Sequence, residues 1–408
     1  MPRTERPRLI TADPPLFAAT LALLAGGLLM VFSATTGVEV HRGLYLKQGV
    51  FALVALAAMF GAARVPTRIY EAFAPVLYTV SIVLLAATLV VGHVGMGAQR
   101  WLGVGPFKFQ PSELAKITTA LLLARYLADR TRDVTRVRTL AAVAALAGLP
   151  AVLVLKEPDL GTALSFPALT AAMLFWAGLP PAYFLFLALP LLGMFFAYSA
   201  AWGTFLGACL LVVLYATRPR ASLAATVVLL YLAVAVVGPR AWTHLEDYQK
   251  ERVVNFINPG HDPTGTGWQL MQSKIAIGSG GPLGRGFLNG TQKRLAFLPM
   301  QHTDFIYSVV GEELGFWGGT AVLLLYCVWL LRGLKIAARS RNRFAGLMCV
   351  GIVGALSYHV LINVWMTLGL APVTGLPLPL MSYGGSSLVI TLSEVGLLLG
   401  AAAREREF

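Results

Sequence analysis

A series of apolar runs, each long enough to cross a bilayer as an α-helix, constrains this chain more than any other feature. About 20 helical residues span the roughly 30 Å hydrocarbon core. Backbone in lipid must satisfy its own hydrogen bonds, and the runs lack the alternation of a membrane β-barrel. We therefore predict an all-α, polytopic membrane protein with about twelve transmembrane helices. The runs lie near residues 15–36, 44–63, 70–92, 112–128, 139–155, 162–179, 181–200, 203–217, 221–238, 304–331, 344–368 and 386–403.

The charged residues support this class and predict an orientation. Only 12% of the 408 residues are charged, against about 25% in soluble domains. The net charge of +13 does not indicate nucleic-acid binding, because the Lys and Arg residues cluster in short loops between apolar runs. With a cytoplasmic N-terminus, nearly every second loop is basic, as the positive-inside rule requires. Both termini are then cytoplasmic. The basic loops are centred near residues 64–68, 125–138, 218–220, 332–343 and 404–406.

One connection is much longer than the others. Residues 239–303 form a polar stretch on the predicted outer face, and loops of this length are usually functional or disordered. We expect an ordered loop within a single membrane domain spanning residues 1–408. In this loop, Asp262 precedes Pro263 in a glycine-rich turn. Asp-Pro here either only initiates a turn or presents a carboxylate from a rigid backbone.

Ionisable residues at membrane depth are costly unless they are paired or functional, and here they crowd the outer ends of the predicted helices. Glu113 and Lys116 share a helix face and are expected to pair, just after Pro111, which suits a helix start. For each charged pair, a structural and a functional role both stay open. No set of His, Cys, Asp and Glu residues has metal-ligand spacing. The candidate site residues at this face are Arg100, Trp101, Glu113, Lys116, Lys156, Asp159, His302, Asp304 and Ser382.

Several long motifs, in one order along nearly the whole chain, resemble the SEDS family (shape, elongation, division and sporulation) of RodA and FtsW proteins. Lys274 and the segment 290–292 look more like RodA than FtsW. The motifs are GAQRWL at 97–102, FQPSELAK at 109–116, EPDLGTAL at 157–164, DYQKERVVNFINPGHDPTGTGW at 247–268, QSKIAIGSGG at 272–281, LPMQHTDFIYSVVGEELGF at 298–316 and LPLPLMSYGGSS at 376–387.

The resemblance implies a peptidoglycan glycosyltransferase of the bacterial inner membrane. Such an enzyme joins lipid II into glycan strands at the periplasmic face during elongation, releasing undecaprenyl pyrophosphate. Its implied partners are a class B penicillin-binding protein and other elongation-complex membrane proteins. Asp262 matches the functional aspartate of the family, and Lys274 falls in a family motif. No cofactor is evident, although a divalent cation such as Mg²⁺ is compatible with the chemistry.

The sequence departs from the family in one place. Members typically have ten spans, whereas about thirty-five extra residues here predict an added helical hairpin near 203–238. An even number of extra crossings leaves the sidedness of the later motifs unchanged. Three alternatives remain: a lipid II flippase, a division role like that of FtsW, and a non-catalytic scaffold. Against a flippase, the polar motifs crowd one face and no inverted repeat is visible.

The predicted topology can be tested by labelling single cysteines. In a cysteine-free background, probes at Arg218 and Asn289 should react from opposite sides of the membrane, because the first lies in a basic loop and the second in the long outer loop. Labelling from the same side would contradict the added hairpin.

Overall fold

The structure, a computed structural model, describes residues 12–36, 43–95, 98–104, 107–186, 189, 200–244, 266–291 and 300–404. Asp262, together with much of the long outer loop, lies outside the described residues.

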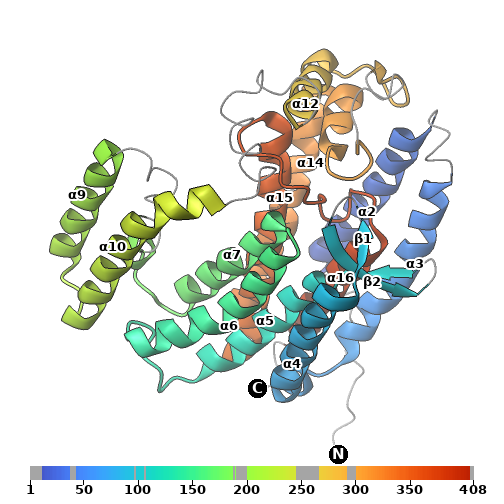
Figure 1. Ribbon diagram of the computed structural model, residues 1–408. Coiled ribbons are helices and arrows are strands. Elements are labelled where there is room, and N and C mark those ends of the chain that lie inside the picture. Colours follow the sequence, from blue (N-terminus) through green and yellow to red (C-terminus); the bar gives the residue numbers. More distant parts are fainter. Residues whose placement is uncertain are drawn as a thin grey trace, which may run out of the picture.

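The described chain is built mainly from long helices, which confirms the predicted all-α class (Figure 1). Seven of the described helices are long and apolar enough to cross a membrane. The total of twelve spans therefore stays a prediction. The helices are α2 (Pro14–Thr35), α3 (Leu44–Arg64), α4 (Thr67–Val91), α5 (Pro111–Ala128), α6 (Val137–Lys156), α7 (Leu160–Trp176), α9 (Ala200–Thr217), α10 (Ala221–His244), α12 (Thr266–Gly280), α14 (Ile306–Arg339), α15 (Arg343–Leu368) and α16 (Gly385–Ala403).

Local sequence signals set several helix ends. Asp13 caps α2 by accepting a hydrogen bond from the Leu16 backbone N–H at 3.0 Å, and Asn342 caps α15 in the same way. Such caps satisfy backbone donors that have no partner inside the helix. Helix α15 ends at Gly369, whose positive φ of 76° suits glycine. Pro111 opens α5, as predicted.

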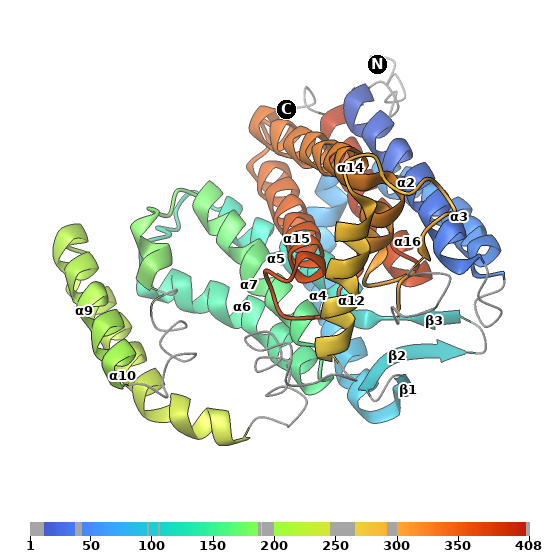
Figure 2. The same cartoon turned by 90° about the horizontal axis from the view of Figure 1, so that it is seen from above.

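The mostly buried helix α15 lies at the centre of the bundle and packs against α5, α7, α12 and α14 (Figure 2). Helix α16 packs along α3, where the Cβ of any larger residue at Gly396 would lie 2.3 Å from the Met59 carbonyl oxygen. These contacts place the outer ends of α5, α15 and α16 around one segment, residues 369–384, which contains no helix.

A small antiparallel sheet between α4 and α5 was not predicted from the sequence. Its strands are β1 (His93–Gly95), β2 (Ala98–Val104) and β3 (Phe107–Phe109), in the order β1-β2-β3. The strands are short and rich in glycine, so they give little periodic signal. Strand β2 carries Arg100 and Trp101, and thus the sheet positions two of the candidate site residues.

Helices α9 and α10 form a pair that stands apart from the bundle (Figures 1 and 2). This confirms the helical hairpin predicted near 203–238. Leu210 and Val227 belong to its own apolar cluster, which reaches the bundle through Leu140 of α6. An ion pair of 3.0 Å between Arg220 and Asp133 also joins the turn of the hairpin to the α5–α6 loop.

Helix α12 lies against the first part of α14, and glycines make this close approach possible. A Cβ at Gly280 would lie 2.0 Å from the Gly311 carbonyl oxygen, and one at Gly284 would lie 2.2 Å from that of Glu313. Gly315 interrupts α14 with a φ of 66°. These glycines therefore allow the backbone around Gly280 and Gly284 to pack directly against the backbone of α14.

Two adjacent glycines of α2 provide a matched test of this packing. A Cβ at Gly27 would lie 2.2 Å from the Leu380 carbonyl oxygen, whereas one at Gly26 would meet nothing within 4 Å. Gly27→Ala should therefore lower the free energy of unfolding by about 1–3 kcal/mol. Gly26→Ala should be neutral or stabilising by up to about 1 kcal/mol. Thermal unfolding in detergent measures both, and equal effects would contradict the packing of α2 on residues 380–381.

Candidate functional site

A cluster of buried charges lies where α5 enters the bundle. The Lys116 ammonium is 3.0 Å from the Glu113 carboxylate, which confirms the predicted pair. It also lies 2.9 Å from Nε2 of His359 on α15. Glu113, Lys116 and His359 are 5%, 4% and 4% exposed, so the ammonium is held almost without solvent. Because a buried charge needs a partner, this contact joins α5 firmly to α15.

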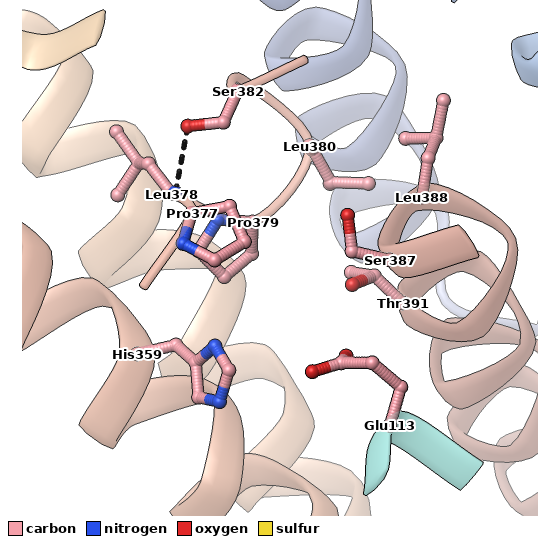
Figure 3. A pocket seen from close by; sticks show the side chains of 10 residues that line it. All are labelled: Glu113, His359, Pro377, Leu378, Pro379, Leu380, Ser382, Ser387, Leu388 and Thr391. Carbon is pink, nitrogen blue, oxygen red and sulfur yellow. Dashed lines mark hydrogen bonds between the residues drawn. The ribbon is translucent and has the colours of Figure 1, made fainter. Parts of the chain in front are cut away.

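A second acid on α16 completes the cluster. Glu394 is 3% exposed and interacts electrostatically with both Lys116 and Glu113. Beside it, Glu113 and His359 face a cavity of about 10 Å³, closed by residues 377–380 and by Ser387 and Thr391 (Figure 3). A polar space of this size holds about one water molecule.

Arg100 forms the centre of a more exposed cluster. Its guanidinium donates to the backbone carbonyls of Glu157, at 3.0 Å, and Pro158, and lies 3.8 Å from the Asp159 carboxylate. Asp159 caps α7 by accepting from Thr162. These contacts hold Arg100 against the α6–α7 turn, while its side chain stays 24% exposed.

Glu157 is the least satisfied group in this region. The residue is 0% exposed, and neither of its carboxylate oxygens has a hydrogen-bond partner among the residues that the structure describes. Burial and, to a smaller extent, the nearby Asp159 carboxylate raise the pKa of Glu157 from its ordinary 4.5 to about 8, against the opposing effect of Arg100. The carboxyl group is therefore mostly protonated at neutral pH.

The irregular segment before α16 brings the remaining candidates together. Ser382 donates to the Thr303 carbonyl at 2.5 Å and accepts from the Leu378 N–H at 2.8 Å (Figure 3), so its hydroxyl fixes the fold of the segment. The buried His302 contacts the Tyr383 ring, with the two ring centroids 5.7 Å apart. This segment thus connects the start of α14 with the start of α16.

Gln110 connects the start of α16 to the Arg100 cluster through two hydrogen bonds. The Gln110 side chain donates to the Asp159 carboxylate at 3.3 Å, and its backbone N–H donates to Ser386 at 3.2 Å. Asp304 lies beside Gly375, with Oδ2 3.5 Å from the place of a Cβ there. The predicted residues of α5, α7, α14 and the α15–α16 segment therefore converge on one end of the bundle.

Other candidates lie outside these contacts. Lys156 is exposed at the end of α6, and Lys274 is exposed on α12, against Gly369. Trp101 is half-buried on β2. Sequence reasoning singled out neither His359 nor Glu394. The position of each within an apolar run was the available signal, since such residues at membrane depth are rare.

The arrangement suits an anionic ligand with an apolar tail. Arg100 presents a positioned cation at the edge of the bundle. Within the described residues, no group of three or more His, Cys, Asp and Glu side chains is placed to hold a metal ion.

The raised pKa of Glu157 predicts a pH-dependent stability. The folded state favours the protonated carboxyl, so this contribution is complete below pH 4.5, declines as pH rises, and is lost above about pH 8. Glu157→Gln mimics the protonated form and should remove this decline. The melting temperatures of both proteins across pH 5–9 should therefore diverge at the alkaline end, with the variant more stable. Parallel curves would contradict the prediction.

Comparison with known proteins places these residues in a family. The chain matches the cell cycle protein family of FtsW, RodA and SpoVE over residues 15–204 and 199–407. The peptidoglycan glycosyltransferase MrdB of Escherichia coli K12 is 37% identical over 390 residues, covering 95% of this chain and 92% of MrdB. The peptidoglycan glycosyltransferase RodA of Treponema pallidum is 34% identical over 427 residues, covering 96% of this chain and 98% of RodA.

Solved structures agree. A chain from a peptidoglycan synthase complex that coordinates polymerization and crosslinking matches with a TM-score of 0.75 and 31% identity, covering 97% of this chain and 99% of that one. The rod shape determining protein RodA of Thermus thermophilus matches with a TM-score of 0.65 and 28% identity, covering 97% of each chain. This chain belongs to the FtsW, RodA and SpoVE family.

Proposed function

We propose that the chain is a peptidoglycan glycosyltransferase that polymerises lipid II into glycan strands at the periplasmic face of the bacterial inner membrane. The observation that carries the proposal is the 37% identity to MrdB across 95% of the chain. The motif around Lys274 favours the elongation role of RodA over the division role of FtsW.

Contacts between loops support the proposed orientation. Asp13, before α2, forms an ion pair of 2.6 Å with Arg332 near the end of α14. Asp133 and Arg220 pair two further basic loops. Each contact joins segments that the positive-inside rule assigns to the cytoplasm. The Arg100 cluster in turn joins two loops assigned to the periplasm, so the proposed active face lies at that end.

The two buried or positioned cations have different roles in this proposal. The Arg100 side chain is 24% exposed, and in this proposal it binds the pyrophosphate of the lipid donor. Lys116 is enclosed by Glu113 and His359, so its charge is compensated within the fold and its role is to organise the helices around the site. Positioned cations of this kind stabilise charge that develops on a leaving group.

Asp262 is the proposed general base. It would take the proton from the acceptor sugar's 4-hydroxyl as that oxygen bonds to the anomeric carbon of the donor. The bond from this carbon to the pyrophosphate breaks in the same step, and undecaprenyl pyrophosphate leaves as a stabilised anion. One displacement inverts the anomeric centre, so one base is enough and no covalent sugar–enzyme intermediate forms. A class B penicillin-binding protein would then cross-link the strands, alongside other elongation-complex proteins.

Purified protein given labelled lipid II tests this function. Wild-type protein should form polymer, whereas Asp262→Asn should lose about 10²–10⁴-fold in rate because it retains the shape of Asp but not its basicity. Asp129→Asn, in a basic loop at the opposite end, is the control and should polymerise normally.

Two results would count against the proposal. Near-wild-type polymerisation by Asp262→Asn would remove Asp262 from the base role. A wild-type protein that moves lipid II between leaflets of a vesicle but forms no polymer would favour the flippase alternative, and one that does neither would favour a scaffold.

A further inference from the structure

A basic cavity lies at the end of the molecule opposite the Arg100 cluster. It has a volume of about 540 Å³ and is lined by Arg130 of the α5–α6 loop, Arg341 and Arg343 of the α14–α15 turn, and Trp176 at the end of α7. Ligand pockets commonly occupy about 300–1,000 Å³. The cavity is therefore large enough for a polar headgroup, and the proposed polymerisation does not use it.

The described residues do not neutralise the charge in this cavity, since none of those that line it is acidic. The nearby Asp129 carboxylate is already engaged by Thr131 and by Arg132, 3.1 Å away. No ion pair involves Arg130, Arg341 or Arg343 in the described part of the chain. Three guanidinium groups around one concave space favour an anion with several oxygens, such as a phosphate.

Apolar surface continues from the cavity along α14. Ala338 lines the cavity, and Leu331 and Leu324 lie seven and fourteen residues before it, on the same helix face. Leu331 is 56% exposed and Leu324 is 62% exposed. Trp176 is 41% exposed at a helix end, where Trp commonly marks the boundary between hydrocarbon and headgroups. A soluble phosphate would use none of this apolar surface, whereas a lipid would.

We propose that this cavity binds the headgroup of an anionic diacyl phospholipid, with acyl chains lying along Leu331 and Leu324 of α14. The arginines contact the phosphate, and the indole N–H of Trp176 lies near Gly346 at the cavity wall, where it can donate to a headgroup oxygen. Basic pockets between transmembrane helices on the cytoplasmic side suit such headgroups. The bound lipid neutralises charge that otherwise repels across the ends of α5, α7 and α15.

Lipid retention by the full-length protein tests this site. The purified chain in neutral detergent would be titrated with dioleoyl phosphatidylglycerol, dioleoyl phosphatidylcholine or inorganic phosphate, and bound adducts would be counted by native mass spectrometry. Wild-type protein should retain phosphatidylglycerol in preference to the other two. Replacing Arg130, Arg341 and Arg343 with Gln should weaken this retention at least about tenfold.

Two further variants distinguish binding at this cavity from general attraction to basic residues and from loss of binding through misfolding. Gln at Arg138, Lys335 and Arg339 removes the same charge from the same end, but none of these residues lines the cavity, so retention should stay within about twofold of wild type. Ala338→Trp places a large side chain in the cavity where the headgroup would lie, leaves the charge unchanged on an exposed helix position, and should also weaken retention at least about tenfold. A melting curve for each variant checks that it is folded.

Three outcomes would overturn the proposal. Equal loss in both triple variants would show diffuse attraction without a site. Retention unaffected by a folded Ala338→Trp protein would place the lipid elsewhere. Phosphate binding with the same arginine dependence, and no preference for phosphatidylglycerol, would assign the cavity to a soluble anion.

Discussion

The Lys116 ammonium is held inside the bundle by the Glu113 carboxylate and the His359 ring, and this contact fixes α5 against the central helix α15. Removing one partner of a buried ion pair typically costs about 3–5 kcal/mol, because the other charge is left without compensation. The Glu113–Lys116 pair lies within α5, and the contact from Lys116 to His359 joins that pair to α15. These residues lie beside the loops that carry the proposed substrate contacts. The same groups therefore stabilise the fold and hold the proposed site in position.

Much of the fold could be predicted from the sequence because its strongest signals are local. The apolar runs predicted the helices, and the Glu113–Lys116 spacing predicted their pairing. His359 could not be assigned, since its partner is 243 residues away along the chain and no spacing rule connects them. Arg100 was predicted as a site residue, but its attachment to the α6–α7 turn depends on a short sheet that has no periodic signal.

The candidate site contains polar groups that are fully hydrogen-bonded within the fold and others that are not. The first kind stabilises the fold, whereas the second kind is available for ligand binding or proton transfer. The Ser382 hydroxyl makes its hydrogen bonds within the fold. The Asp159 carboxylate likewise caps α7 by accepting from the Thr162 N–H. These groups hold the irregular segments that could not be derived from helix periodicity. Arg100, in contrast, keeps its side chain partly exposed, and the Glu157 carboxylate is buried without a hydrogen-bond partner among the described residues. Groups of this second kind are the ones that a bound ligand or a proton can change.

The glycine break in α14 also has a consequence for how the protein matches the thickness of the bilayer. As one straight helix, the 34 residues of α14 would measure roughly 51 Å, far beyond the roughly 30 Å of hydrocarbon. The positive φ at Gly315 divides this length, leaving a segment of roughly 36 Å after it. Glu312 and Glu313 come before the break, so their carboxylates are attached to the shorter, outer piece. The break thereby reduces the hydrophobic mismatch that one straight helix of this length would have.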